Sequence, residues 1–199
     1  MNSVRKAFIT MALAVASIGL LFAQDAPQSE TTAETGNGLE VFIAPTLPRY
    51  GNAIGYSIGV GVQTGLGVFK GNAKSDKSWS DDIVVGLDGN YEYAPGNGFT
   101  FTGGFAYLDA GYAFTLLPDS LRLRVTPTIG VGGTYVSWSD SDDSGYNGFA
   151  FALLPRLSAD MPMPFCKNLR VGLSGGYRMI FANQQLNDPV ASLLIGYQF

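Results

Sequence analysis

The sequence predicts an all-β protein that forms a closed antiparallel up-and-down transmembrane β-barrel of about eight strands. From residue 39 onward, apolar residues recur at every second position, which is typical of strands whose two faces meet different surroundings. No stretch of this part keeps the 3.6-residue period of a helix. The composition, with 26 Gly, 13% aromatic and only 14% charged residues, favours an apolar solvent over water.

The first 38 residues are predicted to be separate from the barrel. An apolar run at residues 7–22 follows Arg5 and Lys6, which is the layout of a secretory signal peptide. We expect cleavage after Ala23, so residues 1–23 are the predicted signal peptide. Residues 24–38 are polar and lack large apolar side chains, which predicts a disordered N-terminal lead-in. The predicted barrel covers residues 39–199.

Eight segments are predicted as strands, an even number that places both ends of the sheet on one side of a membrane. The segments are residues 39–47, 53–69, 83–93, 99–116, 121–138, 149–160, 169–181 and 190–199. The fourth changes phase, which predicts a β-bulge near Tyr107. Pro127 and Pro155 predict local distortion, because proline cannot donate a ladder hydrogen bond. The connection at residues 70–82 is long for a periplasmic turn.

The two faces of these segments differ in residue type. Large apolar residues lie on one parity, and the other parity carries Gly, Ser, Thr, carboxylates and Arg but no Lys. A planar guanidinium can bridge several carboxylates in a confined space, so we expect the polar face to fill the lumen and the apolar face to meet lipid. The predicted lumen ion-pair network comprises Glu40, Asp88, Glu92, Asp109, Arg122, Arg124, Arg156, Asp160, Arg170 and Arg178. Hairpin register predicts that Asp160 lies closest to Arg124 and Arg170.

The last ten residues carry the most specific pattern. Apolar and aromatic residues occupy every second position up to the final one, namely Leu193, Ile195, Tyr197 and Phe199. This pattern resembles the terminal-Phe signature of small bacterial outer-membrane β-barrel proteins, the OmpA/OmpX/OmpW-like class, with no single family assigned. The resemblance implies that these four residues are an assembly signal read by the barrel assembly machinery. It also implies export to the outer membrane, where lipid surrounds the barrel.

Several chemistries are disfavoured by the residues available. The sequence contains no His, on which enzymes among the small outer-membrane barrels are understood to rely, so we expect neither an enzyme nor an imidazole metal site. Thinly spread cations and a net charge of −4 argue against a nucleic-acid partner. Asp140, Asp142 and Asp143 are expected to form a solvated loop rather than a Ca²⁺ site. Cys166 has no partner for an internal disulfide, and no cofactor is expected.

Two functions fit this sequence. The first is a non-enzymatic structural or surface-interaction barrel whose lumen is filled by ion pairs and whose loops meet a surface ligand of unknown identity. The alternative is a narrow channel for small or hydrophobic solutes, of the OmpW-like kind. In either case we expect the turn at residues 161–168 to be periplasmic and the acidic loop around residues 140–144 to be external.

Overall fold

The computed structural model describes residues 39–50, 53–66, 82–96, 99–116, 122–140, 145–182 and 185–199. The predicted signal peptide and lead-in lie outside the described residues, as does most of the long connection at residues 70–82. Asp142 and Asp143 of the acidic loop also lie outside them. Within the described part, no helix has the length and apolar character needed to cross a membrane.

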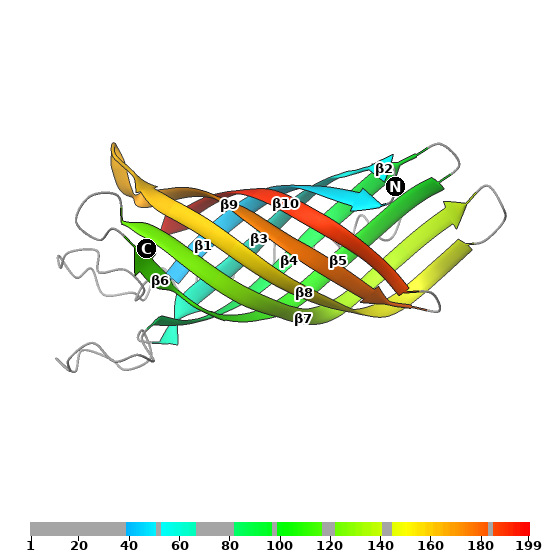
Figure 1. Ribbon diagram of the computed structural model, residues 1–199, viewed down its shortest axis with the longest axis horizontal. Coiled ribbons are helices and arrows are strands. Elements are labelled where there is room, and N and C mark those ends of the chain that lie inside the picture. The colour runs from blue at the N-terminus through cyan, green and yellow to red at the C-terminus, as the bar shows by residue number, and fades with distance from the viewer. Residues whose placement is uncertain are drawn as a thin grey trace.

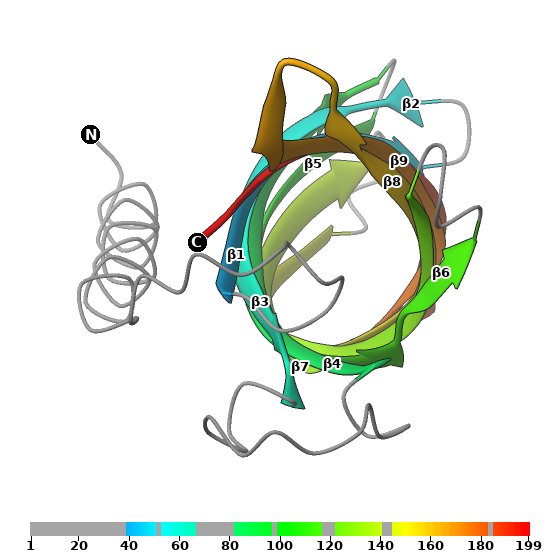
Figure 2. The same ribbon diagram turned by 90° about the vertical axis from the view of Figure 1, so that its left-hand side faces the viewer.

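The described strands form one closed antiparallel β-barrel (Figures 1 and 2). They are β1 (Leu39–Tyr50), β2 (Ala53–Ile54), β3 (Tyr56–Gly65), β4 (Ile83–Pro95), β5 (Phe99–Tyr112), β6 (Phe114–Leu116), β7 (Leu123–Asp140), β8 (Gly145–Met163), β9 (Cys166–Phe181) and β10 (Gln185–Gln198). β2 continues the register of β3 against β1, and β6 continues that of β5 against β7. The ten elements are therefore eight barrel strands, and pairing of β1 with β10 closes the sheet, as predicted.

The barrel has two ends, which we name by what lies there. The Phe199 rim holds the start of β1, the end of β10 and the turn between β8 and β9. The opposite rim holds the ends of β4, β7 and β9. Several strands run further than the sequence predicts, β8 to 19 residues and β9 to 16. These lengths exceed the roughly 9 to 11 residues that a tilted strand needs to cross hydrocarbon.

The predicted bulge near Tyr107 is wrong. β5 pairs with β4 and with β7 in one unbroken register. Phe101, Phe105 and Tyr107 instead point into the lumen, where they are at most 1% exposed. Gly103 makes this possible, because a Cβ there would meet both phenylalanine rings at 2.8–2.9 Å. The phase change in the sequence therefore marks an apolar stretch of the lumen wall and not an extra residue.

The predicted distortion at the two prolines is confirmed as gaps in the ladders. β5 ends at Tyr112 and β6 begins at Phe114, so pairing with β7 lapses opposite Pro127. The pairs between β8 and β9 likewise skip from Leu153 to Arg156, across Pro155. Both gaps leave the register unchanged. The missing N–H of proline thus removes ladder bonds without shifting the facing of any side chain.

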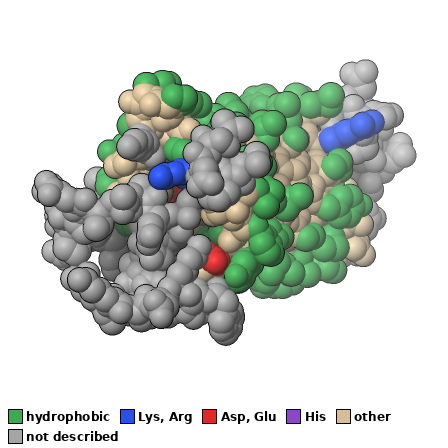
Figure 3. Space-filling view, turned by 60° about the vertical axis from the view of Figure 1, so that its left-hand side comes forward, with side chains coloured by type: hydrophobic (Ala, Val, Ile, Leu, Met, Phe, Trp, Pro, Cys, Tyr) green, Lys and Arg blue, Asp and Glu red, His purple; other side chains and the backbone are tan. Residues whose placement is uncertain are grey.

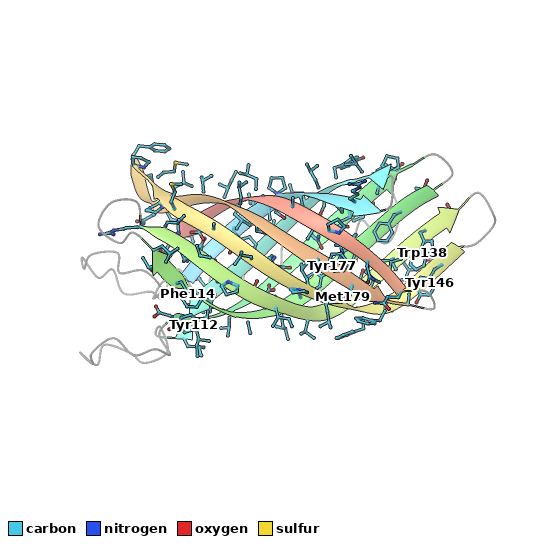
Figure 4. The ribbon with its side chains drawn as sticks, viewed as in Figure 1. Tyr112, Phe114, Trp138, Tyr146, Tyr177 and Met179 are labelled. Atoms are coloured by element: carbon cyan, nitrogen blue, oxygen red, sulfur yellow. The ribbon has the colours of Figure 1, made fainter. Side chains whose placement is uncertain are left out.

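The outer wall of the barrel is apolar. Hydrophobic side chains cover much of the wall visible in Figure 3, and charged side chains appear there only towards the two ends. Aromatic pairs lie near both rims, with Tyr112 and Phe114 at 4.8 Å between ring centroids near the Phe199 rim (Figure 4) and Tyr135 and Phe149 at 4.9 Å near the opposite rim. This distribution is typical of aromatic girdles around an apolar band.

Candidate functional site: the filled lumen

The polar face of the strands converges in the lumen, as the alternation predicts. Each strand supplies every second side chain to the interior, so charged residues far apart in sequence meet there. Their ion pairs gather in three clusters stacked along the bore. We name them the rim cluster (Glu40, Arg124, Asp160, Arg170), the central cluster (Asp88, Asp109, Arg156) and the distal cluster (Glu92, Arg178, Asp188).

The rim cluster lies nearest the Phe199 rim and is built around Asp160. Arg124 donates through Nε to Asp160 Oδ2 at 3.0 Å and through Nη2 to Glu40 Oε2 at 2.6 Å. Arg170 donates through Nε to the other carboxylate oxygen of Asp160. Asp160 pairs with Arg124 across β7 and β8 and with Arg170 across β8 and β9, as the hairpin register predicts. All four side chains are at most 9% exposed.

The central cluster joins three strands through one guanidinium. Arg156 on β8 places Nη1 at 2.8 Å from Asp88 Oδ2 and Nη2 at 2.9 Å from Asp109 Oδ1, and Nε donates to Thr128 Oγ1 at 3.3 Å. The contact with Asp109 is an ion pair whose geometry falls short of a hydrogen bond. One cation therefore holds two carboxylates that would otherwise repel each other.

The distal cluster is fully buried. Arg178 donates to both carboxylate oxygens of Glu92 at 2.6 Å, and to both of Asp188 at 3.0 and 2.6 Å. All three side chains are 0% exposed. The guanidinium carbon also lies 4.0 Å from the ring centroid of Phe105. Bidentate pairing on two sides satisfies a guanidinium that has no access to water.

Apolar side chains fill the lumen on both sides of the distal cluster. Phe101, Phe105 and Tyr107 form a stack on β5 with centroid distances of 6.4 and 6.0 Å. They pack with Val136, Trp138, Leu154, Ile180 and Val190 into one buried cluster, which we call the apolar layer. Trp138 stacks on Tyr146 at 4.9 Å close to the opposite rim (Figure 4). Ring contacts and aliphatic packing therefore replace ion pairs in this part of the bore.

Among the described residues, small cavities lie between the clusters. One of about 30 Å³ lies between the distal and central clusters, beside Asn90 and Tyr107. Another, of about 20 Å³, lies between the central and rim clusters. Each has room for about one or two water molecules, which is too little for a hydrated ion or an organic solute.

The structure changes the predicted residue set at two positions. Arg122 lies just before β7 at φ 46°, with its side chain exposed, so it is not in the buried clusters. Strand parity does not apply to it, because β7 begins at Leu123. Asp188 falls between the predicted strands at residues 169–181 and 190–199, yet it lies within β10 and is 0% exposed. The sequence signal for this position is that Asp188 shares the inward parity of Val190 and Ser192, if the strand is extended towards residue 185.

The other singled-out residues lie where the alternation predicts. Leu193, Ile195, Tyr197 and Phe199 are each 40–47% exposed, on the outer side. Their part in assembly stays a prediction. Cys166 is half-buried at the start of β9. Among the described residues, no group of three or more Cys, Asp or Glu side chains is arranged to hold a metal ion.

Comparison with known proteins identifies the fold but no family. No family model and no curated protein matches the chain. Neisserial surface protein A is similar in structure, with a TM-score of 0.50 and 12% identity over 81% of this chain and 96% of that one. Ail, the attachment invasion locus protein of Yersinia pestis, gives 0.47 and 13% over 82% and 99%. The outer membrane enzyme PagL gives 0.41 and 17% over 79% and 99%.

The closed sheet and the likeness to Neisserial surface protein A thus give the chain the fold of the small eight-stranded outer-membrane β-barrels, without assignment to one family. At these identities the likeness describes the fold alone. Function has to be argued from the residues of the lumen and the wall.

Proposed function

We propose that this protein is a non-enzymatic integral outer-membrane barrel with a closed lumen, and that it serves a structural or surface-interaction role through the loops of its opposite rim. The observation that carries this proposal is the filling of the bore. Three ion-pair clusters follow one another along it, the apolar layer packs around the distal cluster, and two cavities between the clusters hold about 30 and 20 Å³.

The inverted distribution of polarity supports a membrane location. Leu157, Leu173 and Leu108 point outward with 55–68% exposure, whereas Arg178 and Glu92 are 0% exposed inside. In water this arrangement would expose the apolar wall and bury the charges, both at a cost in free energy. In a bilayer the apolar wall contacts lipid chains and is not exposed to water, while the charges stay paired inside the lumen.

The ion pairing of the lumen carboxylates with arginine supports a non-enzymatic role. Each of Glu40, Asp88, Glu92, Asp109, Asp160 and Asp188 lies in an ion pair with an arginine. A general acid or base needs access to a substrate, and these groups are buried around cavities too small for one. The absence of His from the sequence removes the most common catalytic base.

Conductance of the refolded protein in planar lipid bilayers tests the closed lumen. We expect no unitary current steps under conditions in which a refolded porin conducts. Reproducible steps from the purified barrel would contradict the proposal and favour the OmpW-like channel. Insertion is verified in the same preparation by heat-modifiable mobility, so that silence reflects a closed bore and not missing protein.

A further inference from the structure

We infer that the hairpin at residues 161–168 is a lipid-binding element that lies in the interface of the phospholipid leaflet around the Phe199 rim. We call it the rim hairpin. It comprises the end of β8, the turn at Pro164 and Phe165, and the start of β9. The inference rests on the proposed membrane location. It goes further, because a barrel can span a membrane without a turn that contacts lipid.

The rim hairpin extends beyond both neighbouring strands. Among the described residues, pairing of β7 with β8 reaches Asp160, and pairing of β10 with β9 reaches Leu169. Within the described strands, the segment between them is paired only by β8 with β9. Its register shifts between Pro162 and Met163, and irregularities of this kind bend a strand pair out of the sheet. In both Figure 1 and Figure 2 the hairpin, drawn in orange, leaves the wall and leans away from the barrel axis.

Its first six residues are apolar, and Met161, Pro164 and Phe165 among them are exposed. Phe165 is 80% exposed and Met161 is 41% exposed. No charged residue occurs from Met161 to Cys166. A turn surrounded by water has no reason to expose Phe165 and Met161, because each exposed apolar side chain forgoes the free energy of burial. The sequence of this turn therefore points to an apolar partner.

The outward lean identifies that partner as lipid. Met161 shares the outward parity of Leu157, so the apolar wall continues onto the hairpin. A hairpin that bends away from the axis turns its outer face towards the bilayer, and apolar side chains there reach the boundary between headgroups and acyl chains, about 5–10 Å deep. Methionine and phenylalanine suit this irregular apolar region. Continuity with the lipid-facing wall favours the leaflet over a separate protein partner.

Site-directed spin labelling in liposomes tests this inference. Single-cysteine variants Phe165→Cys, Met161→Cys, Leu157→Cys and Ser139→Cys are made in a Cys166→Ser background, and each carries a nitroxide. Leu157 is the reference for the wall, and Ser139, exposed near the opposite rim, is the reference for water. Accessibility to O₂ reports on lipid, and accessibility to a water-soluble nickel chelate reports on water.

We expect the ratio of O₂ to nickel accessibility at positions 165 and 161 to resemble that at 157 and to exceed that at 139 several-fold. A water-like ratio at 165 beside a lipid-like ratio at 157 would overturn the lipid contact and leave the membrane location standing. Shielding of 165 from both reagents would overturn it in favour of a protein contact. A water-like ratio at 157 would instead refute the proposed membrane location.

Discussion

Arg178 and Glu92 lie 86 residues apart in the chain, yet both nitrogens at the end of the guanidinium donate to the two carboxylate oxygens at 2.6 Å. Asp188 is bound by the same guanidinium from the other side. Arg178 comes from β9, Glu92 from β4 and Asp188 from β10, so the cluster ties opposite walls of the barrel together. All three side chains are 0% exposed, and the guanidinium bridges the two buried carboxylates.

Replacement of Arg178 by Met is expected to destabilise the barrel by about 3–5 kcal/mol, since two carboxylates would remain buried without their cation. Urea unfolding in liposomes measures this loss. The triple variant Arg178→Met, Glu92→Gln, Asp188→Asn is expected to recover most of the stability, because neutral groups cost less to bury than unpaired charges. Equal destabilisation of the single and triple variants would mean that packing, and not charge, dominates at this cluster.

Asp160→Ala tests the rim cluster in the same way. It leaves Arg124 without one partner and Arg170 without its carboxylate contact, in surroundings only 4–7% exposed. We expect a loss of about 3–5 kcal/mol in the free energy of unfolding. The neighbouring outward variant Leu157→Ala is the control, because its loss of lipid contact carries no charge penalty. If Asp160→Ala unfolds at the urea concentration of the parent, the rim cluster does not contribute to stability.

The apolar layer makes a separate prediction through Phe105. Its ring is 0% exposed and contacts Tyr107 and Arg178, so Phe105→Ala is expected to cost about 3–5 kcal/mol. Phe149 is 80% exposed on the outer wall, where its main described contact is Tyr135, and Phe149→Ala is expected to cost about 1 kcal/mol. Thermal and urea unfolding of the two variants, measured side by side, would contradict this account if the losses were equal.

The sequence predicts which side chains point into the lumen, because the face to which a strand residue points depends only on whether its position is odd or even. Arg170, Arg178 and Asp160 could therefore be assigned to the interior without knowledge of the barrel. The contacts of Asp160 followed from hairpin register alone, because its partners lie on adjacent strands. The pairing of Arg178 with Glu92 could not be foreseen, since it crosses the bore between strands that are not neighbours.

The errors arose where polarity and parity disagree. The bulge near Tyr107 would turn the apolar residues before it, Phe101 and Phe105 among them, towards lipid, but both rings pack in the apolar layer of the lumen. Asp188 falls outside the predicted strands because the last of them begins at residue 190, although pairing with β9 keeps Asp188 in a strand. Hydrophobicity alone cannot distinguish a lipid-facing aromatic from one that fills the lumen.

The orientation of the barrel in the membrane can be tested with epitopes. If the Phe199 rim is periplasmic, a tag inserted at Ser141, between β7 and β8, should be labelled by antibody on intact cells. A tag inserted at Pro162 in the rim hairpin should be labelled only after permeabilisation. The reverse pattern would invert the orientation, and labelling of both tags on intact cells would contradict a membrane-spanning barrel.

The last prediction compares alanine substitutions at two adjacent glycines of β7, Gly132 and Gly133. Each substitution adds one methyl group, on opposite faces of the strand. A Cβ at Gly132 would collide with the backbone carbonyl oxygen of Ala106 on the neighbouring strand, whereas a Cβ at Gly133 has nothing within 4 Å. Gly132→Ala should therefore force β5 and β7 apart and destabilise the barrel by about 1–3 kcal/mol, as overpacking does.

Gly133→Ala should leave stability unchanged or raise it slightly, because it adds a methyl group on the outer wall and restricts the unfolded chain. Refolding yield into liposomes and the urea midpoint, measured for both variants, check this difference. Equal tolerance of the two alanines would show that β5 and β7 can separate at this point without loss. In that case the close approach of Gly132 to the Ala106 backbone would not be a constraint on the fold.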